Sequence, residues 1–185
     1  MNALNPLIIL LAAFVAVYFE SSFSFFRNLF GAQINLLPPL MVYASLTSGI
    51  ITVALLAVIS GLLFDSLSAN PLGISVVPLF AVGYAIHRFH GLLLREQRYA
   101  QFAFGIAASL LTPLLTLLLL LSGDTNPLVG WGTLWQLLVM GVSGGLLTPF
   151  CFAVLDFLSR ALHYQPIAQV AFRPDREIKR RRGKI

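Results

Sequence analysis

The chain has 185 residues, of which 58% are hydrophobic and only 10% are charged. Soluble domains carry about 25% charged residues, so this composition excludes a water-soluble globule, and the net charge of +5 has to be interpreted by its location. The single cysteine excludes an internal disulfide framework and a four-cysteine metal site. Several apolar stretches exceed the roughly 18 residues that indicate a membrane span. We therefore predict an all-α, polytopic integral membrane protein.

Apolar runs and helix breakers predict six transmembrane helices. The first covers about Pro6 to Phe26, and we expect it to be retained because no basic segment precedes it. The second and third lie within Asn35 to Ser66. The last three cover Pro71 to Arg88, Ala100 to Leu121 and Gly132 to Ser159. The predicted organisation is a transmembrane helical domain over 1–172 and a basic cytoplasmic tail over 173–185.

The uncharged stretch from Leu40 to Phe64 allows two interpretations. One helix of this length would measure about 37 Å, against about 30 Å of hydrocarbon, so it would have to tilt. The turn-prone residues of "SLTSG" favour instead two short helices that meet near Ser48 and Gly49. The second interpretation gives six helices, and the first, with five, stays open.

Charge predicts the orientation of the helices. With six helices, eleven of the twelve basic residues fall on one side and only Arg27 on the other. The positive-inside bias then makes both termini cytoplasmic. A five-helix chain would place Arg27 inside and the N-terminus outside. Both arrangements put the segment 65–73 outside.

Asp65 ends the third predicted helix, where the helix dipole disfavours an anion. It closes a stripe of small residues, Ala57 and Gly61, which lets helices approach closely in lipid. We expect its carboxylate to accept hydrogen bonds from the backbone of residues 66–70 or to pair with Arg27. A contact with a partner protein or a ligand is the less favoured alternative.

The stretch "GLLFDSLSANPLGISVVPL", preceded by "VYASLTSG", resembles the signature region of the MreD family of rod shape-determining proteins. The matching positions are Tyr43, Gly61, Asp65, Leu72 and Gly73, with Tyr84 as a further aromatic match. The chain departs from the family where "QINLLPP" lacks the arginine of an Arg-Pro pair.

The resemblance implies a non-enzymatic scaffold of the cell-elongation machinery in the bacterial cytoplasmic membrane. Such a protein pairs with an MreC-like bitopic membrane protein and couples MreB-like filaments to cell-wall synthases and peptidoglycan synthesis. The candidate partner-interface residues are Tyr43, Ala57, Gly61, Asp65, Pro71 and Gly73. The basic tail is expected to meet anionic lipid or a cytoplasmic partner, rather than nucleic acid, through Lys179, Arg180, Arg181, Arg182 and Lys184.

No set of nucleophile, base and orienting group, no phosphate-cradling glycine loop and no metal-ligand set is visible, so we predict no catalytic residue, cofactor or metal. The alternative function is a solute-binding membrane subunit, similar to the substrate-capture component of a vitamin importer. Ala12 and Ala16 match its docking pattern, but the helices supply few polar groups for a pocket. Glu20, in the first helix, has no companion acid, histidine or asparagine cluster, which argues against a transport relay.

Overall fold

The computed structural model describes residues 4–22, 31–68, 70–89, 98–122 and 130–162. Within these ranges the chain forms helices and no strand. Six helices follow one another: α1 (Leu4–Ser22), α3 (Leu37–Thr47), α4 (Ile50–Leu67), α5 (Val76–Phe89), α6 (Arg98–Ser122) and α7 (Trp131–Leu162). The predicted all-α class and the predicted number of helices are confirmed for this part of the chain.

The break between α3 and α4 lies where the turn-prone residues predicted it. Ser48 closes α3 with its backbone N–H bonded to the carbonyl of Ala44, and both Ser48 and Gly49 have extended backbone conformations. Extended residues cannot continue an α-helix, so two helices replace the single long one. The alternative of one continuous helix over this region is therefore wrong.

The prediction of six membrane spans is confirmed only in part. Three segments of the described helices are long and apolar enough to cross a membrane: Ile50–Leu67, Tyr99–Ser122 and Trp131–Ala161. The apolar segments of the other three helices are shorter, at 10–17 residues: Pro6–Ser22, Leu37–Thr47 and Val76–Phe89. Helix α3, with 11 residues, is only about 16 Å long, which is half of the hydrocarbon thickness.

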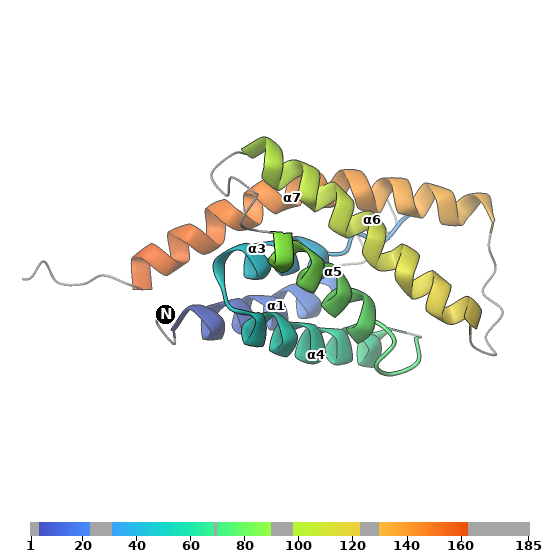
Figure 1. Ribbon diagram of the computed structural model, residues 1–185. Helices are drawn as coiled ribbons and strands as arrows, with labels where there is room; N and C mark the ends of the chain where they lie inside the picture. Colours follow the sequence, from blue (N-terminus) through green and yellow to red (C-terminus); the bar gives the residue numbers. More distant parts are fainter. Residues whose placement is uncertain (1–3, 23–30, 69, 90–97, 123–129, 163–185) are drawn as a thin grey trace, which may run out of the picture.

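Helix α3 lies at the centre of the fold and contacts all five other helices. Every residue from Leu37 to Ser45 is buried, which explains why this helix is apolar on all its faces. Its first turn contains Pro38 and Pro39, and the side-chain oxygen of Asn35 accepts a hydrogen bond from the Leu37 N–H at 2.9 Å. Helices α6 and α7 lie on one side of α3 and α5, and helices α1 and α4 on the other (Figure 1).

The pairing of α6 with α7 depends on glycines of α7. A Cβ atom on Gly141 would lie 2.8 Å from the side chain of Leu110, and one on Gly145 would lie 2.6 Å from Ile106. A Cβ atom on Gly144 would overlap the side chain of Ser109. The glycine pattern of α7 therefore serves packing within the chain, as close approach between helices requires.

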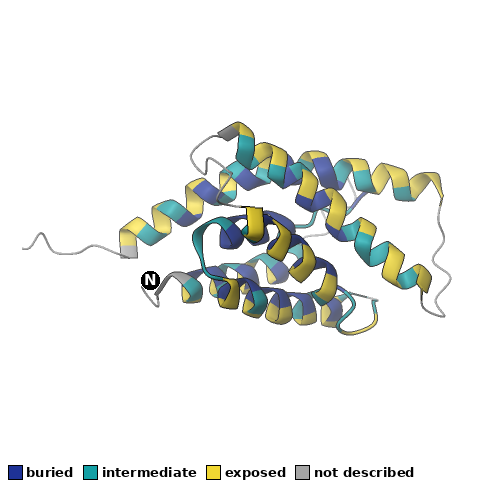
Figure 2. Cartoon of the chain, viewed as in Figure 1, coloured by how far each residue is buried: buried dark blue, intermediate teal, exposed yellow. Residues whose placement is uncertain are grey.

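The outward faces of the long helices are apolar. Figure 2 shows that the buried residues face the interior of the fold and the exposed ones face outward. Large hydrophobic side chains stand among the exposed residues, such as Leu7 at 62%, Ile51 at 75% and Phe157 at 73% of their surface. Soluble monomers rarely expose such continuous apolar surface, so the faces are consistent with contact with lipid. The predicted tail, 173–185, lies outside the described residues.

We predict that Gly144→Ala lowers the free energy of unfolding by about 1–3 kcal/mol, because the new methyl group pushes α6 and α7 apart. The thermal unfolding midpoint of detergent-solubilised protein measures the effect. Gly132→Ala, on the same helix, is the matched control because a Cβ atom there meets nothing within 4 Å. If Gly132→Ala lowered the unfolding midpoint as much as Gly144→Ala, the packing argument would be contradicted.

Candidate functional site

The carboxylate of Asp65 is buried, with 1% of the residue exposed, and it holds the start of α5. Its Oδ2 atom accepts hydrogen bonds from the backbone N–H groups of Gly73 at 2.9 Å and Ser75 at 3.1 Å. Its Oδ1 atom accepts one from the Ser75 hydroxyl at 2.5 Å. The first N–H groups of a helix have no partner within the helix, and a negative charge there is stabilising. Asp65, which belongs to α4, therefore binds the donors of the segment that leads into α5.

The predicted role of Asp65 as an acceptor of backbone hydrogen bonds is confirmed, but the predicted donors in residues 66–70 were wrong. The N–H of Ser68 instead bonds to the backbone carbonyl of Asp65 and closes α4. The side chain is then free to face the segment that leads into α5. The alternative partner, Arg27, lies outside the described residues.

Two glycines shape this turn. Gly73 has a φ of +90°, a backbone conformation that L-residues with a side chain rarely adopt, and it presents its N–H to Asp65. A Cβ atom on Gly61 would come within 3.0 Å of the backbone nitrogen and Cα of Val76. The predicted small-residue stripe therefore packs α5 against α4, with Ala57 fully buried.

Tyr43 joins two helices that are far apart in the sequence. Its hydroxyl donates a hydrogen bond to Oδ1 of Asp156 on α7 at 3.0 Å, and its ring meets Phe152 edge to face at a centroid distance of 4.9 Å. The sequence did not predict this contact. Among the candidate partner-interface residues, only Pro71 is exposed, and Gly73 is partly so. The other four, Tyr43, Ala57, Gly61 and Asp65, are buried within the chain.

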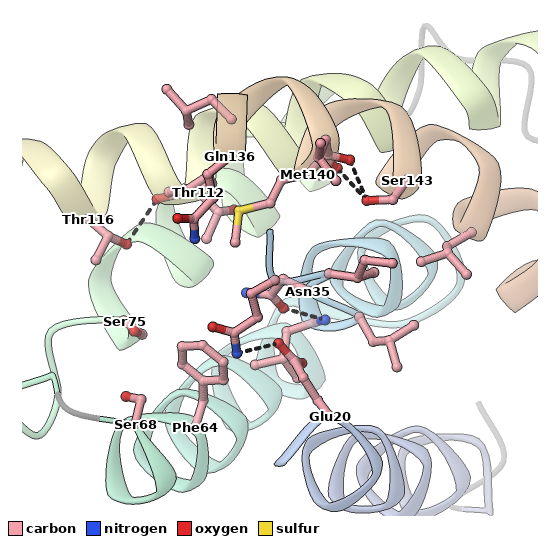
Figure 3. Close-up of a pocket in the computed structure, with 18 of the residues that line it drawn as sticks. Glu20, Asn35, Phe64, Ser68, Ser75, Thr112, Thr116, Gln136, Met140 and Ser143 are labelled. Atoms are coloured by element: carbon pink, nitrogen blue, oxygen red, sulfur yellow. Dashed lines mark hydrogen bonds between the residues drawn. The ribbon is translucent and has the colours of Figure 1, made fainter. Parts of the chain in front are cut away.

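A cavity of about 1280 Å³ lies beside the Asp65 turn, between α6 and α7 and the rest of the fold. The lining comes from the ends of α1 and α4, the start of α5, residues 33–37, the second half of α6 from Thr112 and α7 from Thr133 to Phe150. Figure 3 shows labelled side chains that surround it from different elements, including Glu20 from α1, Phe64 from α4, Thr112 from α6 and Gln136 from α7. We refer to this space as the cavity.

Polar side chains gather in the lining of the cavity. They come from separate segments of the chain: Glu20, Gln33, Asn35, Asn70, Ser75, Thr112, Thr116, Thr133, Gln136 and Ser143. Several of them, Gln33, Asn35, Asn70 and Ser75, lie between the helices rather than on them. Each helix carries few of them, but the fold brings several helix ends together.

Glu20 is the one charged side chain in the described lining. Its Oε1 atom accepts a hydrogen bond from the side-chain amide of Gln33 at 3.3 Å. The buried Oε2 atom, by contrast, has no hydrogen-bond donor. The hydroxyl of Thr112, a residue that is 4% exposed, likewise has no partner. Within the described ranges, no three His, Cys, Asp or Glu side chains are grouped to hold a metal ion.

We predict that Asp65→Ala lowers the free energy of unfolding by about 3 kcal/mol or more, because three donors lose a charged acceptor. Ser75→Ala removes only the hydroxyl donor and should cost about 1 kcal/mol. Ser66→Ala, on an exposed neighbour, is the control. The thermal unfolding midpoints of the three variants in detergent measure their order of stability. An Asp65→Ala protein as stable as Ser66→Ala would refute the capping role.

Comparison of the chain with protein-family models, curated proteins and solved structures gives no match. The resemblance to the MreD family therefore stays a prediction from the motif residues. In the structure, Gly61, Asp65 and Gly73 act together in one turn between α4 and α5, and Tyr43 ties α3 to α7.

Proposed function

We propose that the chain is a non-enzymatic scaffold in the bacterial cytoplasmic membrane, with a role like that of the MreD family in cell elongation. The observation that carries this proposal is the ordered motif of Gly61, Asp65 and Gly73. Its residues are joined by direct packing and hydrogen bonds into one rigid turn. The apolar outward faces and the three long apolar helices support a location in the membrane.

In this proposal the turn is a fixed platform for a partner. The buried hydrogen bonds of Asp65 hold the loop, and its rim carries Pro71 and Leu72, the latter 73% exposed. A preformed rim binds at a lower entropic cost than a mobile loop. The partner would be an MreC-like bitopic protein whose spanning helix enters the same membrane. MreB-like filaments and cell-wall synthases would join on the two sides of the complex.

The basic tail would meet the cytoplasmic leaflet. Its seven basic residues can each contribute about 1 kcal/mol of attraction to anionic lipid. Both termini are then cytoplasmic, and the Asp65 turn and the mouth of the cavity face outward. The alternation of the six helices is compatible with this arrangement, because the helix ends that line the cavity fall on the opposite side from Leu162, the last residue of α7.

A second function, of a different class, is supported by the cavity itself. A volume of about 1280 Å³ with convergent polar side chains is what a solute-binding membrane subunit requires. A scaffold that works by helix packing alone does not require it. The two functions do not exclude each other, and different experiments test them.

The scaffold role predicts that an MreC-like chain from the same genome co-purifies with this protein in detergent. Leu72→Ala should reduce the captured amount at least about threefold if the rim residue contributes a buried apolar contact. Leu55→Ala, a 47% exposed residue in the middle of α4, is the matched control. Failure to capture the partner with intact protein would argue against the scaffold.

The proposed orientation predicts opposite labelling of two engineered cysteines. In a Cys151→Ser background, Leu72→Cys should react with a membrane-impermeant maleimide added to intact spheroplasts. Gly183→Cys, in the basic tail, should react only after the membrane is permeabilised. Labelling of the tail from outside would overturn the orientation.

A further inference from the structure

We propose that the cavity binds an amphiphilic primary amine, with the ammonium group at Glu20 and the apolar chain along α7. This inference depends on the solute-binding role and not on the scaffold role. The first observation is the buried Oε2 atom of Glu20, which has no hydrogen-bond donor among the described residues. A carboxylate held away from water is costly unless a donor or a positive charge compensates it. An ammonium group supplies both.

The sign of the charge in the lining selects the head group. Glu20 is the one charged residue of the described lining, and no lysine, arginine or histidine accompanies it there. A carboxylate or phosphate would meet repulsion from Glu20 without a cation to bind it. This argues for a ligand with a positive group and no anionic one. A free amine fits this condition better than a phospholipid, whose phosphate lies close to its own ammonium group.

The lining along α7 indicates what the rest of the ligand, beyond its head group, should be. Its first turns present Thr133 and Gln136, and later turns present Leu146, Leu147 and Phe150 along the open side of the cavity. Figure 3 shows Glu20 on the α1 side of the space and Gln136 on the α7 side, so that a ligand between them would contact both helices. The volume of about 1280 Å³ exceeds the about 300–1,000 Å³ of ordinary ligand pockets, so a long alkyl chain has room beside the head group.

The fluorescence of Trp135, which lines the cavity, gives a direct reading of binding. Trp131→Phe leaves Trp135 as the single tryptophan, because the chain has two. The probes are dodecylamine, dodecyltrimethylammonium and dodecanoate, added to purified full-length protein in detergent. All three probes have a twelve-carbon chain, so the chain contributes equally to their partition into detergent micelles. Trimethylammonium keeps the positive charge but has no N–H donor.

We expect saturable binding of dodecylamine, binding of dodecyltrimethylammonium about tenfold weaker, and no saturable binding of dodecanoate. Glu20→Gln should weaken dodecylamine about tenfold or more, because the charge-assisted hydrogen bond is lost. Ser109→Ala is the matched control, since it removes an unpartnered buried hydroxyl that does not line the cavity, without changing charge, and it should change the affinity less than about twofold.

Two results would overturn the proposal. The first is that dodecanoate binds as well as the amine, or that Glu20→Gln leaves the amine affinity unchanged. Either would show that the cavity has no preference for an ammonium group, and the solute-binding role would stand. No response to any of the three probes would remove both the amine ligand and the solute-binding role. The probe series with the unmutated Glu20 decides the matter even if Glu20→Gln does not fold. None of these outcomes affects capture of an MreC-like partner, which tests the scaffold separately.

Discussion

The buried carboxylate of Asp65 is the interaction on which the arrangement of the other helices depends. It replaces water as the acceptor for two backbone N–H groups and one hydroxyl at the entry of α5. In an apolar medium these donors would otherwise be unsatisfied, at a cost of several kcal/mol. The bonds fix where α5 starts relative to α4. Since α5 also packs on α3, these bonds bear on how α5 meets the central helix.

Glycines let the helices pack closely around this contact. Gly61 lets the backbone of α5 approach α4, and Gly144 lets α6 approach α7. Van der Waals packing replaces the hydrophobic effect as the main attraction between helices in lipid, so the closeness that glycine allows is itself stabilising. Tyr43 adds a polar link from α3 to Asp156 on α7. The two sides of the fold are thereby joined through α3, while the open cavity lies between them beside the Asp65 turn.

The two proposed functions would use different parts of this structure. A scaffold would use the rim of the Asp65 turn and the apolar outward faces. Solute binding would use the polar side chains that line the cavity together with Glu20. Ser75 belongs to both, because it donates to Asp65 and also lines the cavity. A ligand in the cavity would therefore touch the residue that holds the rim, which gives the two functions a physical connection.

The sequence by itself determined the helical class, the break at Ser48 and Gly49 and the close packing at Gly61, because hydropathy, turn chemistry and residue size act over a few neighbours. Asp65 was recognisable as an acceptor for the same reason. Its donors at Gly73 and Ser75, the partner of Tyr43 and the polar lining around Glu20 were decided only by the tertiary structure. These contacts join residues from separate helices, and the direction in which each helix packs depends on the whole set of long-range contacts.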